Sequence, residues 1–564
     1  MYKKSVIICG QAGQGIQTVC FILAKAIVRS GYYVFAWQDF QSRIRGGETS
    51  SRLILSDEPV KSLPDKYDIL VSLDKTNTDI YMPLIKQDGI VLAEDETDRN
   101  IINIPLKKIA MEIGENKIYA NAAAIGAVWA VIGLPIEKVE NVLRQEFTKK
   151  SENIANRNII VAKHSYKWIE ENCSNCRQKI ETKNGSAKMV LTGNEAVALG
   201  AIAADCRFMA AYPMTPSTGI ITYLSETSHK TGILTEQAED EIAAINMAIG
   251  ASYAGVRSLT ATSGGGFSLM VEGLSLAAMT ETPIVIVLGQ RPGPATGLPT
   301  RTEQGDLNFA LNAAHGEFPR FIFAPSNPVE AFNLMIKAFE VSQKYRVPAI
   351  VLTDQYLADS YWTVDNFDID SIKLNDYFSK PENINGEFKK YMLTDNGISP
   401  RLKPGESGNL VIDDSDEHDQ YGHITENDII RKLMVEKRWK KYCSMIEEMR
   451  VVVPNNIYDS DIVLVSWGSN YGITLESTKM LTAKGIKTTI INFSEIWPLK
   501  VPIVLLNKEK KFKIVVVENN FNGQFAGLLE EKGVVVDYKI LKYNGLPFTE
   551  DEITRIITEK YGKD

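Results

Sequence analysis

The stretch AYPMTPSTGI, residues 211–220, closes an apolar run that begins at Arg207. Pro213 and Pro216 fix φ at their own positions and restrict the residue before each, so the turn is stiff. Three hydroxyl side chains surround the second proline: Thr215, Ser217 and Thr218. A stiff turn after a strand can hold a hydroxyl against a ligand with little ordering entropy left to lose. The alternative is a plain strand exit whose Ser and Thr cap the next helix.

Length and composition narrow the class of protein. The 564 residues are too many for one core and suggest three or four domains. A net charge of −8 without any Lys/Arg-rich block argues against nucleic-acid binding. The N-terminus does not resemble a signal peptide, and the longest apolar run, residues 122–136, is too short to span a bilayer. We therefore expect a cytoplasmic protein with no membrane partner.

Strand and helix patterns predict an α/β protein with three doubly wound domains and one linker. Residues 1–183 alternate strands and helices, which suggests a parallel sheet, and a polar segment follows at residues 172–188. Residues 184–361 carry apolar strands at 258–262, 283–288 and 349–353. Residues 362–452 are charged and predict a crossing linker with a helix over 426–448. The third α/β unit, 453–564, has strands starting at 461, 488 and 513.

A glycine-rich loop, residues 10–15, follows the first strand and precedes a helix. Its glycines Gly10, Gly13 and Gly15 would let backbone N–H groups and the helix N-terminus approach an anion, such as a coenzyme phosphate. Asp39 lies where a ribose-binding acid would, but the GxxGxG spacing differs from the dinucleotide fingerprint. Arg43 and Arg45 add positive charge downstream. A plain tight turn is the alternative interpretation.

The second domain holds further candidates. Glu239, Asp240 and Glu241 open an apolar helix, where the helix dipole alone would favour them, but a carboxylate there can also relay a proton. The loops at 262–267 and 289–297 each follow an apolar strand at its carboxyl end, where α/β sheets bind ligands. Arg291 in the second loop could fork onto a carboxylate or form a salt bridge at the rim.

Several expected signatures of metal or nucleophilic chemistry are missing. Cys173 and Cys176 form the sole CxxC, so four-ligand zinc or iron–sulfur binding is not expected on this chain. This pair is interpreted as incidental, with a redox or subunit-bridging role as the alternative. No Ser-His-Asp or Cys-His set is evident, and His418 and His423 suggest a metal only weakly. No Gly-Asp-Gly followed by a distant Asn, the usual magnesium-pyrophosphate clasp, is present.

Taken together, these motifs resemble one family, the 2-oxoacid:ferredoxin oxidoreductases. Residues 212–217, YPMTPS, are similar to the family's YPITPS motif, and EDEIAAINMAIGASYAG, TSGGGFSLM and RPGPATGLPTRTEQGDL follow in the family's order. The GxxGQG start resembles the gamma domain, and residues 517–524, VENNFNGQ, resemble its C-terminal domain of transketolase type. Met214 and Thr218 replace the family's Ile and second Ser. The resemblance covers essentially the whole chain, in the gamma–alpha fused form.

The resemblance implies a thiamine diphosphate enzyme divided between subunits. It places Glu241 on the aminopyrimidine ring, Thr215 beside the 2-oxoacid, and Arg291 on its carboxylate, with Tyr212 and Pro213 also at the cofactor. Gly10, Gly13, Gly15 and Arg45 are expected to bind a cofactor phosphate, and the resemblance adds coenzyme A as the co-substrate. A beta subunit would supply Mg²⁺ and a [4Fe-4S] cluster, and ferredoxin would take the electrons. The assembly implied is a heterodimer or a dimer of heterodimers.

The resemblance favours 2-oxoglutarate or broad specificity in the oxidative decarboxylation to acyl-CoA and CO₂. Pyruvate and branched-chain 2-oxoacids stay open as substrates. Two other classes also stay open at this point: a nicotinamide-dependent oxidoreductase built on the first domain, and a catalytically silent subunit that only docks a partner.

Overall fold

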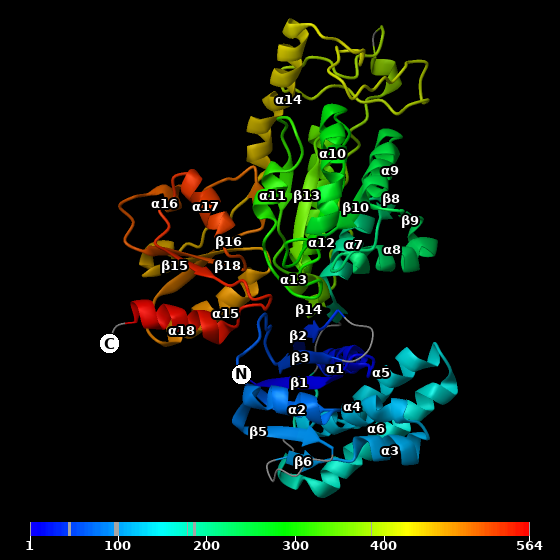
Figure 1. Ribbon diagram of the computed structural model, residues 1–564, viewed down its shortest axis with the longest axis vertical. Coiled ribbons are helices and arrows are strands. Elements are labelled where there is room, and N and C mark those ends of the chain that lie inside the picture. The colour runs from blue at the N-terminus through cyan, green and yellow to red at the C-terminus, as the bar shows by residue number, and fades with distance from the viewer. Residues whose placement is uncertain are drawn as a thin grey trace. The chain divides into compact units, whose positions relative to one another are not determined.

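The computed structural model describes residues 2–42, 47–94, 101–176, 179–183, 188–384 and 386–562. The chain forms two compact units (Figure 1). Unit 1 consists of Met1–Thr192, Asp359–Asn366 and Thr549–Lys560. Unit 2 consists of Gly193–Ala358, Phe367–Phe548 and the last residues from Tyr561.

Unit 1 is built on an eight-stranded sheet in the order β6-β5-β4-β1-β3-β2-β14-β7. Its strands are β1 (Lys3–Gln11), β2 (Tyr33–Phe40), β3 (Glu48–Ser56), β4 (Tyr67–Ser72), β5 (Ile85–Ala93), β6 (Ile101–Asn103), β7 (Lys188–Leu191) and β14 (Tyr361–Asp365). Its helices are α1 (Ile16–Arg29), α2 (Lys75–Tyr81), α3 (Leu106–Gly114), α4 (Ala120–Ile132), α5 (Ile136–Thr148), α6 (Glu152–Asn172) and nearly all of α18 (Glu550–Tyr561).

The sheet of unit 1 is mixed, which corrects the expectation of a parallel sheet. Strands β1, β4, β5 and β6 run parallel, whereas β3 pairs antiparallel with both β1 and β2. The sequence patterns miss β3 because its first half is polar. Thr49, Ser50 and Ser51 are buried in the sheet, but they do not form the apolar run by which a buried strand is recognised.

The apolar run near residue 122 forms α4, whose residues from Ala122 to Ile132 are all buried in the core of unit 1. Helix α4 packs closely on α6 at Gly126. A Cβ at this position would overlap the carbonyl of Ala162, so the close approach requires glycine. Among the described residues, no helix combines the length and the apolar character that crossing a membrane requires.

Unit 2 contains a seven-stranded sheet, β17-β12-β13-β11-β10-β8-β9, and a four-stranded sheet, β16-β15-β18-β19. The first comprises β8 (Cys206–Ala211), β9 (Leu234–Gln237), β10 (Arg257–Thr262), β11 (Val285–Gln290), β12 (Phe321–Phe323), β13 (Ala349–Asp354) and β17 (Glu495–Trp497). The second comprises β15 (Ile462–Trp467), β16 (Thr488–Phe493), β18 (Lys513–Glu518) and β19 (Tyr538–Leu541).

Both sheets of unit 2 are parallel except for the pairing of β12 with β17, so the doubly wound arrangement is confirmed here. Helices α9 (Glu241–Tyr253) and α10 (Gly264–Met279) cover one face of the larger sheet. The other face packs on α7 (Gly193–Ala203), α8 (Thr218–Thr231) and α12 (Pro328–Tyr345). The remaining helices are α11 (Leu307–Asn312), α13 (Gln355–Asp359), α14 (Asp428–Glu448), α15 (Asn470–Ala483), α16 (Ile503–Leu506) and α17 (Gln524–Glu531).

The two compact units do not follow the domain boundaries expected at residues 183, 361 and 452. Strands β7 and β14 pair with each other and extend the sheet of unit 1, although the patterns assigned β7 to the middle domain and nearly all of β14 to the linker. Residues 367–452 are packed into unit 2 rather than forming a crossing linker, because Phe388, Tyr391 and Leu402 are buried there. Strand β17 also joins the expected third domain to the larger sheet.

Candidate functional site

The turn after β8 is braced by its own hydrogen bonds. The backbone N–H and the hydroxyl of Ser217 both donate to the carbonyl of Met214, at 2.9 and 2.8 Å. Asn194 of α7 donates its side-chain amide to the carbonyl of Pro216 at 2.8 Å. The peptide bond between Thr215 and Pro216 is cis. The stiffness expected from the two prolines is therefore realised in a turn whose carbonyls are fixed from both sides.

Helix α9 begins beside this turn. The N–H of Ala238 donates to the carbonyl of Ala211 at 3.1 Å, which ties the approach to α9 to the end of β8. Asp240 is the N-cap, and its carboxylate accepts the N–H of Ala243 at 2.7 Å. Glu241 is then the first residue of the helix, where its charge is favoured by the dipole. The three acids therefore separate into an exposed residue, Glu239, a cap and a buried residue.

Glu241 is 3% exposed, and its Oε1 atom is buried without a hydrogen-bond partner. A buried polar atom left unpaired is costly, so its persistence suggests a missing donor. The carboxylate lies against α10, where a Cβ at Gly266 would overlap both Glu241 Oε1 and Thr262 Oγ1. The glycine is therefore needed for close approach, and the carboxylate sits in a space that only a glycine leaves open.

Arg291 follows β11 and reaches back to the turn. Its Nη1 atom donates to the carbonyl of Thr215 at 2.7 Å, so these two predicted residues are in contact. Burial lowers the pKa of the Arg291 guanidinium, and the nearby carboxylate of Asp306 raises it. Arg291 is half-buried, and one of its nitrogens is engaged by the Thr215 carbonyl. Its other N–H groups can donate to a carboxylate.

The sequence patterns assigned no role to Asp306, although the motif RPGPATGLPTRTEQGDL contains it. Burial raises the pKa of Asp306 to about 6, and the neighbouring Arg291 acts against that rise. Its Oδ2 atom has no hydrogen-bond partner and lies against the N-terminus of α10, where a Cβ at Gly264 would be 2.8 Å away. Its place in this motif was the one signal that could have identified it.

The structure thus brings the three predicted residues to one end of the larger sheet through a chain of contacts. Arg291 touches Thr215, and Thr262 Oγ1 lies 3.9 Å from the sulfur of Met214 in the same turn. Thr262 in turn borders Gly266 and the carboxylate of Glu241. The arrangement offers a cation, a hydroxyl and an unpaired carboxylate at the carboxyl ends of β8, β10 and β11.

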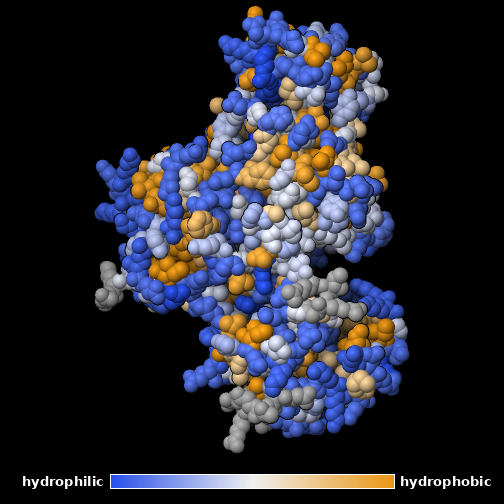
Figure 2. Space-filling model, in the orientation of Figure 1, coloured by the Kyte–Doolittle hydropathy of each residue, from blue (hydrophilic) through white to orange (hydrophobic). Residues whose placement is uncertain are grey.

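Apolar side chains lie exposed around this end of the sheet. Tyr212 of the turn, Ile242 of α9 and Leu269 of α10 are 41%, 49% and 49% exposed. In Figure 2, apolar side chains reach the surface in the part of unit 2 that contains α10. Such exposure beside buried polar groups is typical of a surface that a partner covers.

In unit 1, the glycine loop lies between two hollows. On one side of the loop, a cavity of about 640 Å³ is lined by Gly13, Gln14, Asn116 and Lys117, among others. A second, of about 310 Å³, is lined by Gly13, Gly15 and residues of the β2 and β3 ends. Gly13 and Gly15 have φ of 92° and 73°, a region that favours glycine. The first turn of α1 contains no acid, so its positive end is not neutralised.

Two further predictions concern residues near this loop. Asp39 is buried and pairs with Arg52 at 3.5 Å, so its carboxylate is engaged within the sheet. Arg45 lies outside the described residues, as does Arg43.

The cysteine and histidine candidates have structural contacts. Cys173 and Cys176 form a disulfide. His418 is buried against the ring of Tyr391, with its Nδ1 atom 3.0 Å from the carbonyl of Asp416. In the described part of the chain, no group of three or more His, Cys, Asp or Glu side chains is arranged to hold a metal ion.

Family models match three parts of the chain. Residues 199–436 match pyruvate flavodoxin/ferredoxin oxidoreductase, thiamine diphosphate-binding. Residues 5–168 match pyruvate ferredoxin/flavodoxin oxidoreductase, and residues 455–531 match the transketolase C-terminal domain. These ranges agree with the α/β, three-domain expectation.

Full-length relatives are also found. The chain is 34% identical to the 2-oxoacid:ferredoxin oxidoreductase subunit alpha of Saccharolobus solfataricus, over 98% of this chain and 96% of that protein. It is 28% identical to a 2-oxoglutarate oxidoreductase subunit of Mycobacterium tuberculosis, over 97% and 90%. Among solved structures, the 2-oxoglutarate:ferredoxin oxidoreductase of Magnetococcus marinus, with 2-oxoglutarate, coenzyme A and succinyl-CoA bound, aligns with a TM-score of 0.91. That alignment has 28% identity and covers 99% of this chain and 100% of the other.

Proposed function

The chain belongs to the 2-oxoacid:ferredoxin oxidoreductase family as an alpha subunit, and we propose that its enzyme converts 2-oxoglutarate and coenzyme A to succinyl-CoA and CO₂ and passes the two electrons released to ferredoxin. The observation that carries the proposal is the unpaired buried carboxylate of Glu241 behind Gly266. The ligands named for the Magnetococcus marinus structure support the choice of substrate. Pyruvate and branched-chain 2-oxoacids are the competing substrates.

The residues at this site fit thiamine diphosphate. Glu241 Oε1 lacks a donor, and an aminopyrimidine ring nitrogen that carries a proton would supply one. When bound, thiamine diphosphate would provide a nucleophilic carbon and an electron sink for the loss of CO₂. Glu241 holds and moves the proton at the ring nitrogen, and its burial behind Gly266 keeps water from competing for that proton. Tyr212 and Pro213 open the same turn and are proposed as further contacts of the coenzyme.

Arg291 and Thr215 position the 2-oxoacid. The contact between Arg291 Nη1 and the Thr215 carbonyl fixes the guanidinium while leaving its remaining N–H groups for the substrate carboxylate. The hydroxyl of Thr215, held in the proline-braced turn, then faces the oxo group. Because hydrogen bonds already hold this turn and the Arg291 side chain, the protein loses less conformational entropy when the substrate binds.

Coenzyme A binding is proposed for the glycine loop of unit 1. The open backbone at Gly13, the positive end of α1 and the flanking cavities suit an extended ligand with phosphate groups. Lys117 lines the larger cavity and adds a cation. Gly10 closes the loop at the end of β1, and Arg45 is proposed as a further phosphate contact.

A beta subunit is proposed to cover the exposed side chains of Tyr212, Ile242 and Leu269 and to complete the site. The alpha-subunit names of the relatives imply an enzyme of several subunits. The beta subunit would carry Mg²⁺ and the [4Fe-4S] cluster, with ferredoxin as electron acceptor, in a heterodimer or a dimer of heterodimers. The cytoplasmic location stays a prediction.

An activity screen tests the proposal. The chain is combined with its beta subunit, coenzyme A and a viologen acceptor, and the reduction rate is measured with 2-oxoglutarate, pyruvate and a branched-chain 2-oxoacid. The highest kcat/KM is expected with 2-oxoglutarate. A higher value for either competitor would overturn the substrate choice, and no reduction with any of them would overturn the assembly.

Calorimetry separates this chain's share of the coenzyme site from that of its partner. Thiamine diphosphate should bind weakly or not at all to the isolated chain, because Glu241 contacts only the ring. Tight binding without the beta subunit would contradict the divided site.

A further inference from the structure

A group of buried charges lies where α14 packs beside the residues that follow α10. It is separate from the candidate site at Thr215, Glu241 and Arg291. Lys437 and Lys441, one turn apart on α14, both donate to the carboxylate of Glu281 at 2.5 Å. All three side chains are at most 4% exposed. One carboxylate therefore faces two ammonium groups, which leaves a positive charge in excess inside the protein.

Two arginines enlarge this excess. Arg401 donates to the side chain of Gln343 and to the carbonyl of Ser252, at 2.5 and 2.7 Å, both neutral acceptors. Arg346 is 6% exposed and donates from Nη1 to the carbonyl of Pro400 at 3.2 Å. Its Nε atom is buried without any hydrogen-bond partner. A buried cation without a counter-charge is among the most costly arrangements in a folded protein.

A further cation, Lys390, approaches from the segment that precedes α14. It pairs with Asp413, and that pair is neutral as a whole. The cations Arg346, Lys390, Arg401, Lys437 and Lys441 thus outnumber the carboxylates that act on them, which are Glu281, Asp413 and, near Arg401, Asp376. Burial among other cations disfavours the charged form of a basic side chain. Accordingly, burial lowers the pKa of Arg401 to about 9 and that of Lys441 to about 8.

A small internal cavity lies in the middle of these groups. Its volume is about 20 Å³, which accommodates one water-sized particle. Arg346, Lys390, Arg401 and Thr282 line it together with Glu281, whose two oxygens are taken by the lysines. Leu402 and Val411 close it with apolar side chains.

We propose that this cavity binds one small inorganic anion of the size of chloride. An anion there accepts the unpaired N–H of Arg346 and offsets the excess charge of the arginines and lysines. Arg401 and Lys390 belong to the segment between β14 and α14, whereas Arg346 directly follows α12 and Thr282 lies between α10 and β11. The anion therefore stabilises the packing of that segment on the rest of unit 2.

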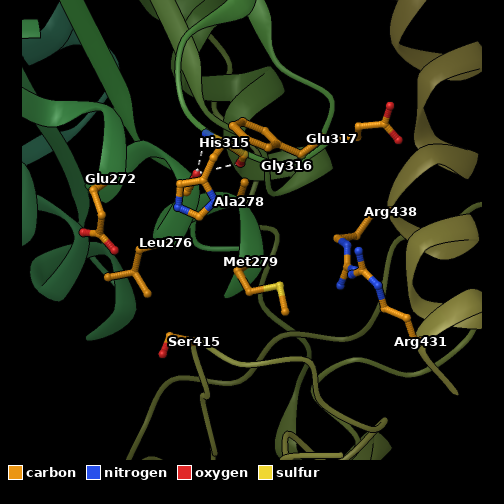
Figure 3. A pocket seen from close by; sticks show the side chains of 12 residues that line it. Glu272, Leu276, Ala278, Met279, His315, Gly316, Glu317, Ser415, Arg431 and Arg438 are labelled. Atoms are coloured by element: carbon orange, nitrogen blue, oxygen red, sulfur yellow. Dashed lines mark hydrogen bonds between the residues drawn. The ribbon is translucent and has the colours of Figure 1, made fainter. Parts of the chain in front are cut away.

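A neighbouring cavity shows what balanced charges look like in the same region (Figure 3). It has a volume of about 240 Å³ and is lined by Arg431 and Arg438 of α14. Both arginines pair with Glu417, and Arg438 does so through two hydrogen bonds of 3.1 and 2.9 Å. Glu272 and Glu317 also line it. This cavity therefore has no excess of cations, and the proposal does not extend to it.

Bromide, which scatters anomalously, tests the proposal on the full chain. Crystals grown in gluconate and soaked in sodium bromide should show one anomalous peak beside Arg346. In solution at constant ionic strength, replacing gluconate by chloride or bromide should raise Tm by at least about 1 °C. Density for a water without anomalous signal, or equal Tm values in the three salts, would overturn it.

A matched pair of variants isolates the cavity. Arg346→Met should abolish the halide-dependent rise in Tm. Arg320→Met is the control, because Arg320 is equally buried but donates to the carbonyls of Ala310 and Ala313 and does not line the cavity. It should lose stability and keep the halide response. A halide response that survives in Arg346→Met would overturn the proposal, and if that variant does not fold, the bromide crystals decide.

Discussion

Two glycine-rich turns, residues 10–15 in unit 1 and 263–267 in unit 2, each join a strand to a helix but need glycine for different reasons. In the first, Gly13 has a φ of 92°, and no atom lies within 4 Å of the position that a Cβ would occupy, so backbone conformation decides. In the second, the glycines have ordinary φ, but Gly264 and Gly266 lie against the carboxylates of Asp306 and Glu241. At Gly13 the backbone conformation requires glycine, whereas at Gly264 and Gly266 the neighbouring carboxylates require it.

The largest effect is expected at the carboxylate that Gly266 accommodates. Glu241→Gln should lower kcat by at least about 100-fold in the reconstituted enzyme, because it removes the group that moves the ring proton. Glu239→Gln changes an exposed acid two residues away and should leave kcat unchanged. Near-wild-type turnover of Glu241→Gln would remove Glu241 from this role.

Gly266→Ala should lower kcat by about 10- to 100-fold, since a Cβ there displaces Glu241 or Thr262. Gly265→Ala is the matched control: its nearest neighbour, the carbonyl of Ala295, is 3.9 Å away. Steady-state kinetics of the two variants with 2-oxoglutarate makes the comparison. Equal losses in both would mean that close approach to Glu241 is not what the turn requires.

Arg291→Lys should raise KM for the 2-oxoacid by about 10- to 100-fold, because an ammonium cannot bridge the Thr215 carbonyl and fork onto a carboxylate. The loss should be similar for 2-oxoglutarate and pyruvate, since both carry the same 2-oxo carboxylate. A loss confined to 2-oxoglutarate would instead assign Arg291 to the distal carboxylate.

Gly13→Ala should weaken coenzyme A binding by a factor of about 3 to 10 and lower the Tm, because alanine is strained at this φ. Titration calorimetry with coenzyme A measures the first effect. Gly527→Ala in α17, which has open space and an ordinary φ, should leave the affinity unchanged. Unaltered affinity in Gly13→Ala would remove the loop from the coenzyme A site.

The smallest effect concerns Asp306. Its pKa of about 6 in the folded chain exceeds the ordinary value of about 3.9 in the unfolded chain. The folded state therefore binds more protons between these values, and its stability falls as the pH rises from about 4 to 6. In Asp306→Asn this part of the pH dependence should disappear from thermal unfolding curves. An unchanged pH profile would show that Asp306 titrates normally.

Much of unit 2 could be predicted because its strands are short apolar runs, several of them bounded by Gly or Pro. The expected strand at 349–353 matches β13, and the expected helix at 426–448 matches α14. Strand β3 could not be predicted, because four of its buried residues are Thr or Ser and only pairing with β1 and β2 makes them part of a strand. Local patterns also assigned residues 362–452 to a linker, since charged residues are normally solvated.

By itself, the sequence determined where strands end, which turns are stiff and which carry glycines, because proline and glycine act through the backbone of their own neighbourhood. Only the tertiary structure decided which distant side chains share a space. Glu281 meets Lys437 and Lys441 across separations of 156 and 160 residues, and Arg291 meets Thr215 across 76. Such contacts depend on the packing of whole elements, and local propensity does not encode them.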